Sequence, residues 1–416
     1  MLAFAALGTI TVSRPEIGVA AGLVITSMNP AVAGAPPWAL STLWTVFLLV
    51  VALTRWAIER RQQRNLPTLG FVTLLFLAVT IVGLARTPDM GDALPVLRST
   101  ATGIAFFFVI ASQIRTRRQI QWVVSGASVG ALLIGGYATW EYVSGSGSFG
   151  FITSSGALVG RVTAGFGHPN QLGGFLLLVL PVAMAGVGLC RRGRSLYLIA
   201  VVLAAIGIYA SFSRAALVAL AMVPLAFLRW RHTLVVVPVL ACITLVAIPD
   251  LIQERFATLT PRGAEVAGRS DYWRTAGTIW ADQPVLGAGL GSFPSAYART
   301  RLAGKQFLPS TALQSPPHAH NLFLQLLAEQ GVAGLVALLA VLAASLHWIL
   351  RMRRARERWI RLTSNALLAS LAAFLVHNLF DLTLLERTAV YFWALLGLVS
   401  AVTMIQGNED QLEGAG

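Results

Sequence analysis

The sequence predicts an all-α polytopic integral membrane protein with about 12 transmembrane helices and a large external loop that contains short helices. Its 416 residues are 56% hydrophobic and 12% charged, with a mean hydropathy of +0.71, and a soluble domain of this size needs more charge to cover its surface. Several runs of about 18–25 apolar residues lack interior charge, as helices across a ~30 Å hydrocarbon core require. The strand alternation of a membrane barrel is absent, and lipid admits only helices and closed barrels.

Apolar segments of membrane length follow one another along the whole chain. They are residues 16–28, 37–54, 68–85, 98–114, 121–140, 171–190, 196–210, 214–229, 233–250, 321–349, 361–380 and 388–405. Residues 1–13 are apolar but too short to span alone. They either extend the first helix through Arg14 and Pro15 or form a separate helix.

The segments divide the chain into four parts. Residues 1–250 hold helices 1–9 with a loop near 144–169, residues 251–320 form the largest loop, residues 321–406 hold three more helices, and residues 407–416 form a tail. The short loops on one side are strongly basic, and Lys and Arg collect in cytoplasmic loops. These loops are 55–64, 115–118, 190–194, 229–232 and 351–361. The two long loops are therefore expected outside the membrane, and the tail in the cytoplasm.

Composition argues against several classes of function. The net charge of +14 is explained by basic cytoplasmic loops, so it does not imply a nucleic acid partner. Cys190 and Cys242 lie in or beside apolar runs and are interpreted as packing residues without a disulfide. No cleavable signal peptide is expected. The pattern Gly-x-Gly-x-Gly over 287–291 has no βαβ context, so it predicts a tight turn and no nucleotide site.

A second set of cations lies on the expected outer face, where the positive-inside rule disfavours them. It comprises Arg98, Arg161, Arg214, Arg255, Arg262, Arg269, Arg274, Arg299, Arg301, Lys305 and Arg387. Simple pairing with nearby Asp and Glu is favoured for Arg255, Arg262, Arg299 and Arg301. The remaining excess indicates an anionic partner.

Three of these arginines have unusual settings. Arg214 occupies a short turn between apolar helices, where a charge is costly without a wet cavity or a partner. Arg161 lies in a Gly-rich stretch that we expect to be flexible, and Asn170 after it can cap the next helix. Arg269 immediately precedes aromatic residues of the large loop. Guanidinium groups grip phosphate oxygens bidentately, so three on one face would suit a lipid-linked pyrophosphate.

The large loop contains a predicted amphipathic helix over 268–284 with Ser270 as its N-cap. Its aromatic and apolar positions share one side at helical spacing. These are Tyr272, Trp273, Ala276 and Trp280. Either the membrane interface or a substrate would suit this face.

Two of the six histidines, His318 and His320, stand where the large loop meets the helix that follows. The positive end of that helix disfavours an imidazolium, and a neutral imidazole can accept a proton from a hydroxyl. Three alternatives are a polar cap, half of a metal site, and a plain loop role for His318. A metal is disfavoured because no third ligand has recognisable spacing and no Asp-x-Asp occurs. His168 is the other external histidine that can join a site.

Four segments in this order carry a family resemblance. They are GRVTAGFGHPNQLGG (160–174), SFSRAAL (211–217), GRSDYWRTAGTIWADQPVLGAGLGSF (268–293) and HNLFLQLLAEQGVAG (320–334). The last has His-Asn, nine residues, then Gly-x-x-Gly. Together they cover about residues 160–340 and resemble the bacterial O-antigen ligases and related O-oligosaccharyltransferases.

The resemblance implies a multi-spanning, inverting, metal-independent glycosyltransferase of the bacterial inner membrane, with its active site at the periplasmic face and no cofactor. It implies an undecaprenyl pyrophosphate-linked glycan as donor and the lipid A-core of lipopolysaccharide as acceptor, among membrane lipids, with neither nucleic acid nor nucleotide as a partner. By motif position, His320 is the general base. The implied substrate-binding residues are Arg214, Arg269, Arg161, His318, Asn321 and Arg274.

Three other functions stay open. O-antigen polymerases and protein O-oligosaccharyltransferases belong to the same superfamily, and the latter usually carry a larger soluble C-terminal region. A transporter of lipid-linked glycans would place its charged sites near the bilayer midplane. The unexplained charges here are predicted at one face, beside a large loop, which favours an enzyme.

Overall fold

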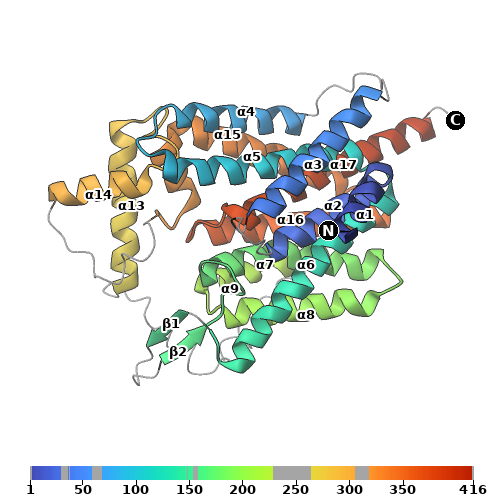
Figure 1. The fold of residues 1–416 in the computed structure, drawn as a ribbon, viewed down its shortest axis with the longest axis horizontal. Helices are drawn as coiled ribbons and strands as arrows, with labels where there is room; N and C mark the ends of the chain where they lie inside the picture. Colours follow the sequence, from blue (N-terminus) through green and yellow to red (C-terminus); the bar gives the residue numbers. More distant parts are fainter. Residues whose placement is uncertain are drawn as a thin grey trace.

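The computed structural model is a bundle of helices with one small β-hairpin (Figure 1). The residues that it describes are 2–29, 36, 38–58, 68–147, 149–152, 158–227, 264–304 and 318–414. Within them, seven helices are long and apolar enough to cross a membrane, and further apolar helices are shorter. The predicted all-α polytopic membrane fold is confirmed.

Helices occupy eleven of the twelve predicted segments. The remaining segment, 233–250, lies outside the described residues. The N-terminal residues form a helix of their own, α1 (Leu2–Ser13), separate from α2 (Pro15–Met28). Pro15 starts α2 because its fixed φ suits a first helical position and its ring would disrupt a continuous helix.

The long helices form the body of the bundle. They are α3 (Ala39–Ile58), α4 (Thr68–Leu84), α5 (Met90–Gln113), α6 (Arg117–Ser144), α7 (Pro169–Leu189), α8 (Arg194–Ala210), α15 (Leu322–Met352), α16 (Arg358–Asn378) and α17 (Glu386–Gly414). The segment predicted as one span over 214–229 is two short helices, α9 (Arg214–Leu220) and α10 (Met222–Phe227), separated at Ala221.

Small residues allow several of these helices to pack with their backbones close together. A Cβ atom on Gly126 of α6 would lie 2.7 Å from the Cα of Ala20 in α2, and one on Gly135 would lie 2.6 Å from the carbonyl carbon of Leu203 in α8. Close backbone approach through small residues is typical of helices in membranes. It holds α6 close to α2 and α8.

The elements of the long loops gather at one end of the bundle. In Figure 1, α13 (Ala264–Asp282), α14 (Phe293–Gly304) and the hairpin of β1 (Phe149–Ile152) and β2 (Leu158–Arg161) lie on the left. The C-terminus and the basic turn 190–193 between α7 and α8 lie at the opposite end. One end of the bundle therefore carries the basic turn 190–193, and the other carries the loop elements.

The glycine pattern in the large loop is a tight turn, as predicted. Gly287, Gly289 and Gly291 all have positive φ, between 67° and 109°. The turn packs against a break in α15 at Gly331, whose φ of 62° and ψ of −161° are not helical. There Val332 N–H donates to the carbonyl of Pro284 at 2.8 Å, so the loop supplies a hydrogen bond that the broken helix lacks.

The predicted N-cap of the amphipathic helix is wrong. Helix α13 starts at Ala264, so Ser270 lies inside it. The helix includes residues 264–269 because they contain no proline. Their one glycine, Gly268, is tolerated inside a helix at a modest cost. The aromatic face is partly as predicted, with Ala276 buried and Trp280 37% exposed.

Candidate active site

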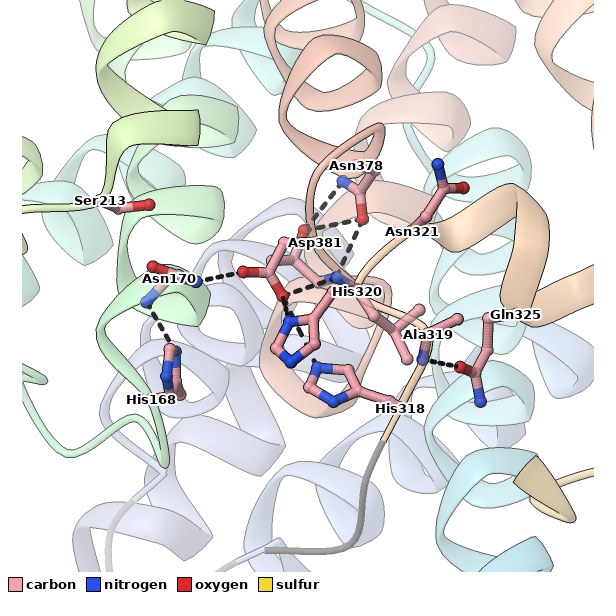
Figure 2. Close-up of polar contacts among 12 residues, drawn as sticks. His168, Asn170, Ser213, His318, Ala319, His320, Asn321, Gln325, Asn378 and Asp381 are labelled. Atoms are coloured by element: carbon pink, nitrogen blue, oxygen red, sulfur yellow. Dashed lines mark hydrogen bonds and ion pairs between the residues drawn. The ribbon is translucent and has the colours of Figure 1, made fainter. Parts of the chain in front are cut away.

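Four chain segments meet at the end of the bundle that carries the long loops, and Asp381 lies among them (Figure 2). His318 and His320 precede α15, Asn170 lies in the first turn of α7, and Ser211 ends α8. Asp381 itself comes from the turn between α16 and α17. The sequence analysis singled out the two histidines but not Asp381.

Both imidazoles face one carboxylate oxygen. The Oδ1 atom of Asp381 lies 3.5 Å from His320 Nδ1 and 3.6 Å from His318 Nε2. The planes of the two rings are tilted by 42°, with centroids 4.0 Å apart. The two nitrogen–oxygen distances are longer than those of ordinary hydrogen bonds, and His320 Nδ1 has no hydrogen-bond partner among the residues that the structure describes. Polar contacts in catalytic sites often tighten only when substrate binds. With His320 Nδ1 turned to the carboxylate, its Nε2 is the atom left for a proton-transfer partner.

Asp381 is an ionised carboxylate held by protein donors. Its side chain is buried, Leu382 N–H donates to its Oδ1 at 2.8 Å, and the Asn170 side-chain amide donates to its Oδ2. Burial alone would raise the pKa of this carboxyl, but the facing imidazoles of His318 and His320 lower the pKa well below its usual range. A fixed negative charge therefore lies beside the two rings at neutral pH.

The surroundings of His320 favour its neutral form. Burial is the largest cause that lowers the pKa of His320 from its ordinary 6.5, and the charges of His318 and Arg269 lower it further, while Asp381 opposes these effects. The Tyr272 ring of α13 lies 5.6 Å from the His320 ring, between centroids. Helix α13 thus places the cation Arg269 and the aromatic ring of Tyr272 near the His320 imidazole.

The backbone at His320 is strained. Its φ is 47°, in the left-handed region that few non-glycine residues adopt. Ala164 and Phe212, in the two other loops of the site, also have positive φ, at 45° and 46°. Strain of this kind persists where surrounding contacts fix the backbone, and it gathers at functional sites. Here, the residue following the strained position, Asn321, caps α15 and anchors it by donating to the Leu379 carbonyl at 2.9 Å.

Arg161 is a buried residue that contacts the site through Asn170. It is 8% exposed, and it donates to the Ser211 carbonyl at 2.9 Å and to Asn170 Oδ1 at 3.0 Å. The expectation of a flexible stretch is wrong at this residue, because β2 and these bonds hold it. Asn170 is not a helix cap either. His168 caps α7, with its Nδ1 accepting from Asn170 N–H at 3.1 Å, and the Asn170 side chain instead joins Arg161 to Asp381.

The other predicted arginines lie on elements around the histidines. Arg269 is half-buried on α13 and acts electrostatically on His320. Arg214 is the half-buried first residue of α9, directly after Ser213, which caps that helix. Arg274 is exposed on α13. The structure thus links Arg161 and Arg269 to the histidine–carboxylate group and places Arg214 beside the 211–213 turn that Arg161 contacts.

A comparison with protein families identifies the middle of the chain. Residues 199–339 match the family model for O-antigen ligase. This segment of the chain is therefore similar to the O-antigen ligase family. A search of curated proteins gave no match.

The O-antigen ligase match contains part of the site. It spans α9, α13 and the start of α15, and therefore includes Arg214, Arg269, His318 and His320. Asp381, Arg161 and Asn170 lie outside the matched segment. The matched family implies a glycosyltransferase-like activity of the ligase or polymerase type. The fold brings Arg161 and Asn170 from before the matched segment, and Asp381 from after it, to the same site.

The two histidines and Asp381 have the composition of a metal site. Their candidate ligand atoms all lie within 4.8 Å of one another. The sequence analysis disfavoured a metal because it found no third ligand, and the fold supplies one. Two observations favour a hydrogen-bonded role instead. Both oxygens of Asp381 already accept hydrogen bonds, and the cation Arg269 lies close enough to lower the pKa of His320, which disfavours a second cation there.

Asp381 was the main residue of the site that sequence reasoning missed. It is an acidic residue in a short turn between two apolar helices, where an unpaired charge is costly and is usually stabilised by a partner. The search for unexplained charges on the outer face considered only Lys and Arg. Applying it to acids as well would have found Asp381, although no spacing links it to His320.

Proposed function

We propose that this protein is an O-antigen ligase, which moves a glycan from undecaprenyl pyrophosphate to a sugar hydroxyl of lipid A-core. It works at the periplasmic face of the bacterial inner membrane and needs no metal. The observation that carries the proposal is the neutral His320 held against an ionised Asp381, with the Arg269 cation nearby. This arrangement combines a base with positive charge, which transfer from a diphosphate donor requires.

The reaction needs one proton transfer and one displacement. The acceptor hydroxyl attacks the anomeric carbon, the new C–O bond forms with inversion, and the bond from that carbon to the pyrophosphate oxygen breaks. His320 Nε2 takes the hydroxyl proton, and Asp381 stabilises the resulting imidazolium. A positioned base typically contributes about 10²–10⁴-fold.

The leaving pyrophosphate carries the electron pair away as negative charge. Fixed cations that meet this charge stabilise the transition state more than the ground state. Arg269 and Arg214 are the proposed groups for this role. Arg269 acts electrostatically on His320, and Arg214 starts α9 directly after the 211–213 turn that Arg161 contacts. Arg161 acts through Asn170 and Asp381, so we assign it to positioning. His318 shares Asp381 and is assigned to the acceptor side.

An apolar cavity next to the site suits the polyprenyl chain of the donor. It measures about 570 Å³ between α15 and α16, and its walls are almost wholly aliphatic. Phe323 and Leu379 at its edge adjoin Asn321, which donates to the Leu379 carbonyl. A lipid tail in this cavity would leave the pyrophosphate at the histidine end.

Gene deletion in the source bacterium tests the proposed function. Loss of a ligase leaves bare lipid A-core while undecaprenyl-linked chains accumulate, and the wild-type gene restores the long chains. A polymerase would instead leave core that carries a single repeat unit. Purified protein that transfers no sugar in detergent, although it binds donor, would support a transporter and contradict the proposal.

A further inference from the structure

A chain of buried hydrogen bonds connects the histidine loop to the interior of α15. The backbone N–H of Ala319, which lies between the two histidines, donates to Gln325 Oε1 at 2.7 Å (Figure 2). The Gln325 amide then donates to Glu329 Oε1 at 2.8 Å. Ala319, Gln325 and Glu329 are all buried. Because a buried amide needs an acceptor, the position of Ala319 is tied to the position of Gln325.

The other end of the chain is the glycine turn of the large loop. Phe293 N–H donates to Glu329 Oε1 at 3.1 Å, and Gly291 N–H also donates to the carboxylate. The Glu329 main-chain carbonyl accepts from Gly289 N–H at 3.0 Å. Glu329 therefore receives bonds from the loop on one side and from Gln325 on the other.

A carboxylate suits this position because every neighbour named is a donor. It has acceptor sites for several N–H groups, whereas an amide in its place would turn an NH₂ toward one of them. Glu329 lies two residues before the break in α15 at Gly331. The same turn that fills the break thus also reaches the histidine loop through two side chains.

We infer that Gln325 and Glu329 are positioning residues for His318 and His320, and that they couple docking of the large loop to the geometry of the imidazole pair. The inference rests on the proposed function for its kinetic consequence. Neither side chain contacts the rings. They act on Ala319, whose displacement would move the flanking histidines away from the Oδ1 atom of Asp381.

The alternative is that the pair merely stabilises the fold. Gln330 offers a matched control, because it is also buried on α15, next to Glu329, but its Oε1 accepts from Thr80 Oγ1 of α4 at 3.3 Å and not from the histidine loop. Q325L and Q330L each replace one buried amide by an aliphatic group of similar size. A structural role alone would make the two variants alike.

The test uses the full chain in lipid nanodiscs with three further variants: E329Q, Q325E and the swap Q325E/E329Q. In the swap, the carboxylate at position 325 accepts from Ala319 N–H and from the amide at position 329, whose oxygen accepts from Phe293 N–H. Two quantities are measured. One is kcat and donor KM for glycan transfer, and the other is the rate at which diethyl pyrocarbonate modifies His318 and His320, followed by mass spectrometry.

We expect Q325L to lower kcat at least tenfold with donor KM within twofold, and to change the modification rate of the histidines. Q330L keeps the wild-type kcat and the wild-type modification rate of the histidines. Q325E and E329Q each lower kcat, and the swap Q325E/E329Q restores kcat to within threefold of wild type. Unchanged kcat and modification in Q325L, or equal losses in Q325L and Q330L, would overturn the inference. If Q325L does not insert, the swap decides, since a tenfold loss there contradicts the coupling. A wild-type chain without transfer activity defeats the proposed function, while the modification rates still test the positioning.

Discussion

The Nδ1 atom of His320 lies 3.5 Å from the Oδ1 atom of Asp381. The two residues are far apart in sequence, because His320 precedes α15 and Asp381 follows α16. Asp381 can therefore hold the ring in the tautomer whose Nε2 lone pair is free, and can stabilise the imidazolium that proton transfer creates. The Asn170 amide and Leu382 N–H fix the carboxylate in turn. The pair is the part of the site from which the following predictions derive.

Removing the base or its carboxylate should abolish most transfer while leaving the protein folded. H320A is expected to lower kcat by about 10²–10⁴-fold, and D381N by at least about tenfold because the ring loses its orientation. H347A is the matched control, since His347 lies near the other end of α15 and makes an edge-to-face contact with Trp348. The measurement is glycan transfer by purified protein, with insertion checked separately.

The two changes should not add in combination. Groups that act as a unit lose most of the activity with the first substitution, so H320A/D381N is expected to be no slower than H320A within error. A double variant slower by the product of the two single effects would show that Asp381 acts independently of His320.

The pH dependence should report the titration of His320, which must be neutral to accept a proton. Burial and Arg269 lower its pKa below the ordinary 6.5. The rate therefore falls as the pH drops through that lowered value and is level at neutral pH. R269Q removes a charge that lowers the pKa, so the acid limb moves to higher pH. D381N removes a group that raises it, so the limb moves to lower pH.

Profiles of kcat/KM from about pH 4.5 to about pH 8 report the essential groups of the free enzyme. Normalising each profile to its plateau separates the position of the limb from the loss of rate. Shifts in the same direction for R269Q and D381N would contradict the assignment of the limb to His320.

Much of the fold follows from hydropathy, because lipid imposes helices of a definite length. The break of the 214–229 segment at Ala221 was not predicted, since the apolar run continues across it. Nor was the start of α13 at Ala264. The Ser270 signal is local, and a favourable local cap does not prevent a helix from starting earlier.

The site was less predictable than the fold. His318 and His320 are adjacent in sequence and stand at a loop–helix junction, so their pattern was visible. Asp381 and Asn170 meet them only through the packing of α7, α16 and α17, which no spacing encodes. The same limit affected the metal argument, because a third ligand can come from any segment that the fold brings near.

Removing divalent ions should leave transfer unchanged. The His318, His320 and Asp381 atoms are close enough to bind a metal, so added Zn²⁺ is expected to inhibit by occupying the imidazole nitrogens that the reaction uses. Transfer is measured after treatment with EDTA, then with Zn²⁺, Mg²⁺ or Mn²⁺ added back. Lost activity that one of these ions restores would show that the histidine–carboxylate group holds a catalytic metal.

Docking of the large loop should depend on Gly331. Its φ of 62° and ψ of −161° favour glycine, and a Cβ there would lie 2.4 Å from both the carbonyl carbon and the oxygen of Val285. G331A therefore strains both the break in α15 and the turn before it, at a cost of about 1–3 kcal/mol for the backbone conformation alone. G277A is the matched control on α13, where no atom lies within 4 Å of the added Cβ, and a helical Gly-to-Ala change stabilises by about 0.5–1 kcal/mol.

Thermal unfolding in one detergent at one scan rate compares the two variants, and the midpoint should fall for G331A and stay level or rise for G277A. Transfer should fall with G331A as well, because the substitution displaces the glycine turn from α15. Gly291 of that turn and Phe293 directly after it donate hydrogen bonds to Glu329. A G331A variant with the wild-type midpoint and wild-type kcat would mean that the turn does not hold the histidine loop, even with Val285 so close to position 331.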